Sequence, residues 1–305
     1  MKTLSLSKNI LPTILFLCLV FFACKKETSQ DDLTAQEEEK ASLAISESEA
    51  ESEIMFNDIF DNVMGANNDV GLAGTGIFGR ISTNSFATET ARLTGCFILS
   101  VTRLVQGQDF PLRIEIDFGA GCPGKDGRIR TGKIITEYTG RLLVPGKSAT
   151  TSFIDYTVDS IKVEGNLKIT NTGNSNLRQF SFDVSGGKLT RPNGNYTRWN
   201  SHKEITQLEG LATPEIHIDD VFGVTGYASG EIKTSSFATS WESNIIEPLR
   251  KRYSCSWLSK GVVKIIRHNL SPDSKWIGLL NYGNGTCDNK ATLTVNGLDH
   301  QIILN

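Results

Sequence analysis

The sequence lacks the short motifs typical of the commonest catalytic and metal sites. It has only four histidines, and no Gly-x-Ser-x-Gly turn occurs, so nothing indicates the nucleophilic serine of a hydrolase triad. No His-Glu-x-x-His motif and no Cys-x-x-Cys pair is present. The densest cluster of possible ligands, His217 with Asp219 and Asp220, fits a polar turn better than a metal shell. The sequence therefore predicts no catalytic residue, no metal ligand and no cofactor.

An excess of basic residues is also missing. The formal net charge is −3, and the acidic residues are concentrated between positions 25 and 53, which hold ten acids against three lysines. The chain from residue 54 onward is nearly neutral. A chain with so little positive charge has no strong field to attract nucleic acid, so we expect no nucleic-acid partner.

No apolar run is long enough to cross a membrane comfortably as a helix. The run from residue 10 to 23 is shorter than the ~20 apolar residues that a spanning helix needs. It follows Lys2 and Lys8 and precedes Cys24, which is the order of charged region, apolar region and cleavage site in an export signal. We therefore expect residues 1–23 to be a signal peptide.

The residues around Cys24 resemble the lipobox of bacterial lipoproteins. Ala23 and Cys24 end the apolar run, while Phe21 and Phe22 depart from the stricter Leu-Ala/Ser pattern, in the relaxed form common among Bacteroidota lipoproteins. The resemblance implies that the thiol of Cys24 is acylated, with palmitate among the chains, and that the membrane is a partner through this anchor. It places the protein in the cell envelope, at the outer membrane, on the periplasmic or the surface face. An ordinary secretory signal with an incidental cysteine is the alternative.

Four cysteines remain beyond the lipobox: Cys96, Cys122, Cys255 and Cys287. An even number in an exported chain predicts two disulfides, and four cysteines allow three connectivities. The loop Asp-Phe-Gly-Ala-Gly-Cys at 117–122 resembles Asn-Tyr-Gly-Asn-Gly-Thr-Cys at 281–287, and each loop follows an earlier cysteine. If the two loops are repeats with the same geometry, Cys96 joins Cys122 and Cys255 joins Cys287.

The rest of the chain divides into a tether, a helix and a β domain. Residues 24–45 are acidic and poor in large apolar side chains, which predicts a flexible tether. Residues 46–65 space their apolar side chains by four and five positions, which predicts one short amphipathic helix. From residue 70 to 305 the apolar pattern has period two, as in residues 161–169, and this is typical of antiparallel strands.

We expect the β domain to form antiparallel sheets, either as a sandwich or as a curled open sheet. Two repeated lobes are the alternative to one domain. The pair Asn296-Gly297 favours a two-residue type I′ turn. Such a turn would pair Val295 with Leu298, Leu293 with His300 and Ala291 with Ile302, and so set the register of the last two strands.

Exposed aromatic side chains are the main candidates for a binding role. A flat ring can stack on a sugar, and Trp199 has Tyr196, Arg198 and Asn200 nearby, which can stack or form hydrogen bonds. We therefore name Trp199 and Tyr196 as candidate ligand contacts. Aromatic residues of β proteins more often lie in the core, and that alternative predicts a buried Trp199.

Several segments together resemble a group of Bacteroidota lipoproteins of unassigned function. They are the lipobox with residues 24–26, the 117–122 loop with residues 126–128, and residues 219–221 and 287–289. The resemblance covers most of the chain and implies no activity.

Three functions are open at this point. The first is a non-catalytic cell-envelope lipoprotein that binds a glycan, a protein or another envelope component. The alternatives are a carrier of an apolar ligand in a curled sheet, and a hydrolase with a pair of carboxylates that no motif reveals. An exposed aromatic row would favour the first, a continuous apolar groove the second, and two convergent carboxylates in a cleft the third.

Overall fold

The computed structural model describes residues 33–65, 90–91, 96–124, 126–174, 176–213, 219–268 and 270–304. The expected signal peptide and Cys24 lie outside these ranges. The single helix within them, α1 (Ala35–Gly65), is not apolar enough over its length to span a membrane.

The β domain is one antiparallel sheet of fifteen strands, as expected for a mainly β protein. The strands follow one another in chain order across the sheet, except that β4 pairs only with β5, so the sheet is not closed. Their bounds are β1 Thr90–Ala91, β2 Ile98–Arg103, β3 Leu112–Asp117, β4 Cys122–Pro123, β5 Ile129–Tyr138, β6 Ser148–Val158, β7 Ile161–Asn171, β8 Gln179–Thr190, β9 Tyr196–Glu209, β10 Val221–Lys233, β11 Ala238–Arg252, β12 Leu258–Arg267, β13 Gly278–Asn284, β14 Lys290–Val295 and β15 Leu298–Ile303.

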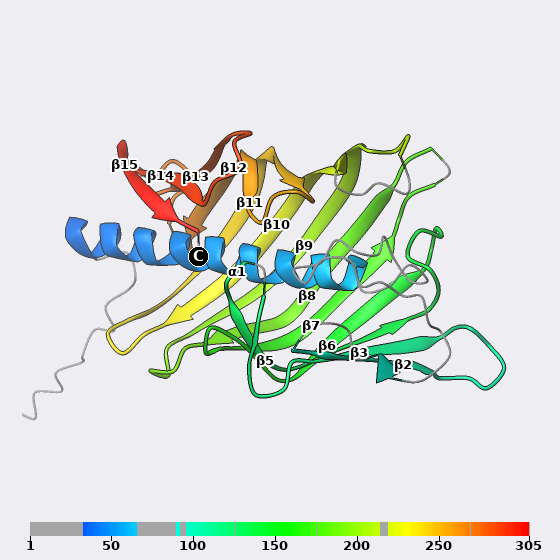
Figure 1. The fold of residues 1–305 in the computed structure, drawn as a ribbon. Helices are drawn as coiled ribbons and strands as arrows, with labels where there is room; N and C mark the ends of the chain where they lie inside the picture. The colour runs from blue at the N-terminus through cyan, green and yellow to red at the C-terminus, as the bar shows by residue number, and fades with distance from the viewer. Residues whose placement is uncertain are drawn as a thin grey trace, which may run out of the picture. The chain divides into compact units, whose positions relative to one another are not determined.

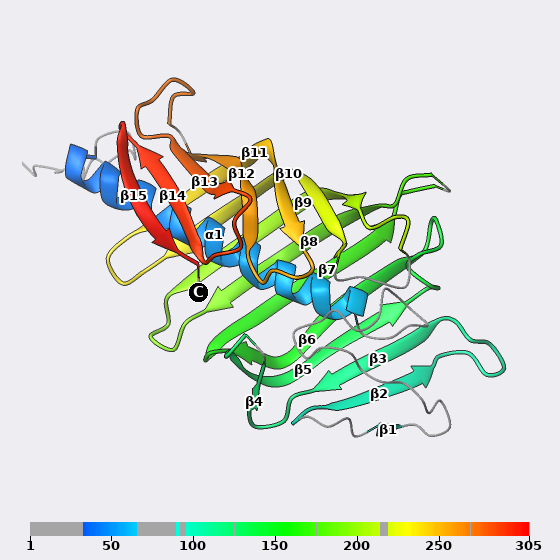
Figure 2. The same ribbon diagram turned by 45° about the horizontal axis from the view of Figure 1, so that its top comes forward.

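The sheet curls into a trough, and α1 lies in its concave face (Figures 1 and 2). This is the curled open sheet of the two expected arrangements, and not a sandwich. Both cysteine loops belong to the same continuous sheet, so the described strands form one body and not two lobes.

Period-two patterning places alternate side chains of each strand against the helix or in solvent. In β7, Val163, Leu167 and Ile169 are buried, whereas Lys162 and Lys168, on the other face of the strand, are exposed. The register shifts at Gly165, and a side chain there would come within 2.7 Å of the Cα of Gly187, so the close approach of the two strands requires a glycine. The strand therefore continues through this glycine with an irregularity.

The last hairpin has the predicted register. Val295 pairs with Leu298, Leu293 with His300 and Ala291 with Ile302, and both Asn296 and Gly297 have positive φ, as a type I′ turn requires. Leu298 nevertheless lies 55% exposed, so the apolar face of the hairpin is incomplete at the turn.

Helix α1 is longer than predicted, and residues 24–32 of the predicted tether lie outside the described residues. The helix begins at Ala35 and not at Ser46, so the prediction of a flexible tether over 24–45 is wrong for residues 35–45. A capping box begins it, since the amide of Thr34 donates to Glu37 at 2.9 Å while the amide of Glu37 donates to the hydroxyl of Thr34. The acidic first turn also complements the helix dipole.

Four acids of α1 form buried ion pairs with strands of the sheet. Glu38 meets Arg267 at 2.6 Å, Glu53 meets Lys203 at 2.9 Å, Asp58 meets Arg130 at 3.0 Å and Asp61 meets Lys251 at 2.8 Å. Removing one partner of a buried pair leaves an uncompensated charge, at a cost of ~3–5 kcal/mol. These pairs therefore determine where along the trough the helix sits.

The C-terminal half of α1 adds apolar contacts to the ion pairs. Its buried apolar side chains are Ile54, Met55, Phe56, Ile59, Phe60, Val63 and Met64. Phe56 stacks on Trp199, with ring centroids 5.4 Å apart, and Phe60 packs edge-on against Phe182. The hydroxyl of Tyr138 donates to the carbonyl of Val63 at 2.9 Å, close to the end of the helix.

Burial raises the pKa of Asp61 to about 6, although Lys251 acts in the opposite direction. A carboxyl with a raised pKa in the fold binds its proton more tightly than in the unfolded chain. Its contribution to stability is therefore complete at low pH and is lost as the pH rises through about 6.

We predict that acidification from pH 7.5 to 5 stabilises the wild type relative to Asp61→Asn, because only the wild type takes up this proton. Urea unfolding of both proteins at the two pH values measures the difference. A gap between the two unfolding free energies that stays constant with pH would contradict the prediction.

Candidate functional site: a cleft beside the helix and the last strand

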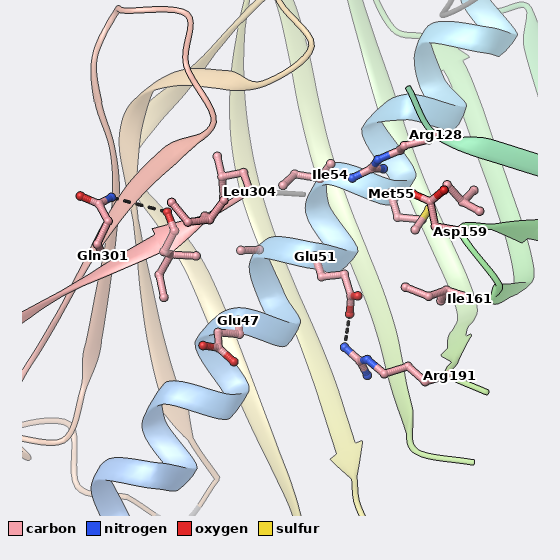
Figure 3. Close-up of a pocket in the computed structure, with 14 residues that line it drawn as sticks. Glu47, Glu51, Ile54, Met55, Arg128, Asp159, Ile161, Arg191, Gln301 and Leu304 are labelled. Carbon is pink, nitrogen blue, oxygen red and sulfur yellow. Dashed lines mark hydrogen bonds and ion pairs between the residues drawn. The ribbon is translucent and has the colours of Figure 1, made fainter. Parts of the chain in front are cut away.

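A cleft of about 550 Å³ opens where α1, the last strand and three turns of the sheet meet (Figure 3). This volume lies within the range usual for small-molecule sites, ~300–1,000 Å³. Its lining consists of Glu47, Ala50, Glu51, Ile54, Met55, Arg128, Val158, Asp159, Ile161, Arg191, Gln301, Ile302, Ile303 and Leu304.

One face of α1 forms a wall of the cleft. Glu47, Ala50, Glu51 and Ile54 follow the i, i+3, i+4, i+7 spacing that places side chains on the same side of a helix. Glu49, between them in sequence, points instead into the trough and is 1% exposed. The helix thus presents one charged face to the sheet and a second to the cleft.

The β6–β7 turn forms the wall of the cleft opposite the helix. Asp159 and Ser160 both have positive φ, and the Asp159 carboxylate accepts a hydrogen bond from the amide of Ile129 at 2.8 Å. The amide of Asp159 donates in turn to the carbonyl of Ile129 at 2.9 Å. These two bonds fix the start of β5 and so position Arg128, the residue before it, at the cleft.

Charge in the cleft is mixed. Glu51 forms an ion pair with Arg191, which follows β8, and Figure 3 shows this pair near the middle of the cleft. Burial raises the pKa of Glu51, while the positive charges of Arg191 and Arg128 lower it. Neither Glu47 nor Arg128 forms an ion pair with another residue of the described ranges. The cleft thus contains the Glu51–Arg191 ion pair and, among the described residues, one carboxylate and one guanidinium without an ionic partner, those of Glu47 and Arg128.

The expected aromatic binding residues lie elsewhere. Trp199 is 0% exposed, and its indole N–H donates to Glu49 at 2.8 Å, so the prediction that this ring faces a ligand is wrong. Trp241 donates to the same carboxylate at 2.8 Å. Tyr196 is half-buried on the sheet, with Lys188 and Arg198 over its ring at 5.2 Å, and it does not line the cleft.

Both predicted disulfides are present. Cys96 bonds to Cys122, and Cys255 bonds to Cys287. Neither lines the cleft, so the disulfides constrain the β domain without taking part in the site.

The 219–220 region has no metal-binding geometry in the part of the chain that the structure describes. Asp220 is buried and accepts from the side-chain amide of Gln207 at 2.5 Å, and Asp219 accepts from Thr213 at 2.7 Å. His217 lies outside the described residues, and within those residues no group of three or more His, Cys, Asp or Glu side chains could hold a metal ion.

The five charged residues of the cleft, Glu47, Glu51, Arg128, Asp159 and Arg191, were not foreseen as a site from the sequence. Glu47 and Glu51 stand one helical turn apart in an acidic stretch, and this i, i+4 spacing was a signal that they share a face. Arg128 and Arg191 lie in turn segments with no pattern that links them to the helix.

Comparison with known proteins adds no relative: no family model, curated protein or solved structure matches the chain.

We predict that Trp199→Ala lowers the free energy of unfolding by ~3–5 kcal/mol, because it leaves a cavity and removes the donor to Glu49. Tyr227, which is 56% exposed on β10, offers a matched control, and its replacement by alanine should change stability by less than ~1 kcal/mol. Chemical denaturation compares the two variants. Equal effects would show that Trp199 does not hold the helix in the trough.

Proposed function

We propose that this protein is a non-catalytic, lipid-anchored protein of the cell envelope that binds an envelope component in the cleft. The cleft is the observation that carries the proposal: it combines a ligand-sized volume with apolar side chains and with two charged groups that have no ionic partner in the described part of the chain. Concave sites of this composition, apolar with a few placed polar groups, are the usual places for ligands.

The N-terminal sequence supports the anchor. A charged start, an apolar run and a cysteine followed by Lys25 and Lys26 resemble a lipoprotein signal, and nine residues separate Cys24 from Thr34, the cap of α1. Acylation of Cys24 would hold the β domain close to the outer membrane, because two or three chains anchor a protein stably.

A carrier of an apolar ligand fits the fold less well. The concave face of the sheet, where such a ligand would lie, holds α1, and the buried acids and cations there would be costly to leave without partners.

A hydrolase has weak support in the cleft. Glu47 and Glu51 are the convergent carboxylates that this function would need, but Arg191 already engages the carboxylate of Glu51. A group held in an ion pair is a poor choice for transferring a proton to substrate. Binding is therefore the function that the cleft supports best.

We predict that Cys24→Ala abolishes acylation and releases the protein from the membrane, because the acyl chains on this thiol are the proposed anchor. Metabolic labelling with a fatty-acid analogue and membrane fractionation measure the outcome. Undiminished labelling and membrane association of the variant would contradict the lipid anchor.

We predict that Ile303→Trp weakens binding of the purified β domain with α1 to envelope material, because Ile303 lines the cleft and a larger ring fills it. The matched control is Ile246→Trp on β11, since Ile303 is 50% exposed and Ile246 53%, and only Ile303 belongs to the cleft. Co-sedimentation with cell-wall sacculi and with outer-membrane vesicles of a Bacteroidota bacterium measures binding.

Loss of binding in Ile303→Trp, with wild-type binding in Ile246→Trp, supports the proposal. Equal binding by both variants, or no binding by the wild type to either material, overturns it. Melting midpoints of both variants confirm that each is folded.

A further inference from the structure

Two charged side chains of the cleft lack an ionic partner in the described part of the chain. Arg130, Arg191 and Arg267 each meet a carboxylate, whereas Arg128 meets none. Glu47 likewise pairs with no cation, although Glu51 one turn further along does. The carboxylate of Asp159, the remaining acid of the cleft, accepts a hydrogen bond from the amide of Ile129.

Glu47 and Arg128 lie at different ends of the cleft. Figure 3 shows Glu47 at one end of the helical wall and Arg128 beside Ile54 and Met55, with the Glu51–Arg191 pair between. Seven helical positions separate Glu47 from Ile54, which corresponds to a rise of about 10 Å. A ligand that satisfied both groups would carry a cation and an anion separated by roughly this distance.

The edge of β15 adds backbone groups to the same cleft. Leu304 donates its amide to the carbonyl of Asn289, so Leu304 and every second residue before it direct their backbone groups towards β14. Gln301 and Ile303 therefore point their N–H and C=O groups away from β14. No strand of the described ranges pairs with this edge, and both residues line the cleft. Such an edge is a template for an added extended chain.

The size of the cleft agrees with this occupant. An extended chain rises about 3.3 Å per residue, so three or four residues span the distance between the two charged groups. Ile54, Ile161 and Ile302 supply apolar contacts for side chains along the way.

We propose that the cleft binds a short oligopeptide of three or four residues with free ends. Its amino group lies towards Glu47, its carboxylate lies towards Arg128, and its main chain forms hydrogen bonds with the edge of β15. This inference rests on the proposed function and names the chemical class of its ligand.

Calorimetric titration of the purified protein with tetra-alanine tests the two charged ends. Capping the carboxylate as an amide should weaken binding by about tenfold, the loss expected when one charge-assisted hydrogen bond is removed. Acetylating the amine should have a similar effect. Arg128→Gln should weaken binding of the free peptide and leave binding of the amide unchanged, and Glu47→Gln should show the same selectivity for the free amine.

Three further variants test the backbone edge and the general effect of removing a positive charge. Ile303→Pro removes an N–H that faces the cleft and takes no part in pairing with β14, so it should abolish binding. Asp299→Pro, at an exposed position of β15 with the same backbone orientation but outside the cleft, should retain binding. Arg103→Gln, on the well-exposed end of β2, should bind as the wild type does. A released cell-wall stem tetrapeptide, titrated beside tetra-alanine, shows which source of peptide is preferred.

Equal binding of free and capped peptides, or no binding of any peptide at millimolar concentration, overturns the peptide proposal. If Ile303→Trp still abolishes binding to sacculi or vesicles in that case, the proposed function stands with another ligand. If binding to sacculi and vesicles is also unaffected, both proposals fail.

Discussion

The carboxylate of Glu49 is the contact on which the packing of helix and sheet depends. It accepts hydrogen bonds from the indoles of Trp199 and Trp241 and, at 2.6 Å, from the hydroxyl of Ser243. Water cannot replace it, because Glu49 and these donors are buried. Without that carboxylate, three donors from β9 and β11 would be left unsatisfied, each at a cost of ~1–3 kcal/mol. These hydrogen bonds also fix the orientation of α1, and so the positions of Glu47 and Glu51 at the cleft.

Local patterns predicted the parts of the fold that local chemistry determines. The Asn296-Gly297 turn set the register of the last hairpin, and the similarity of two loops gave the correct disulfides. The burial of Trp199 was not predicted, because the other residues on its face of β9 are polar. They are Thr197, Ser201 and Lys203, and they are buried too. Lys203 pairs with Glu53 of α1, and the polar residues of this face make the buried side of β9 look like a solvent-facing side in the sequence.

The cleft could not be foreseen because its lining comes from distant parts of the chain. Residues 47–55, 128, 158–161, 191 and 301–304 meet only through the curl of the sheet. The start of α1 was missed for a related reason. An acidic segment with few large apolar residues resembles a tether until Arg267 and other partners more than 200 positions away are known to pair with it.

Packing α1 against the late strands has a consequence for how the chain acquires its fold. The helix is made first, yet its contacts extend from β5 to β14, and Glu38 must wait for Arg267. Contacts so far apart in sequence close slowly, since the loop entropy is lost before the contacts form. When the chain is delivered with its N-terminus first, the acidic helix and the cations of the trough stay exposed and unpaired until β12, which holds Arg267, has been delivered. Its folding would therefore be completed only after nearly the whole polypeptide has been delivered.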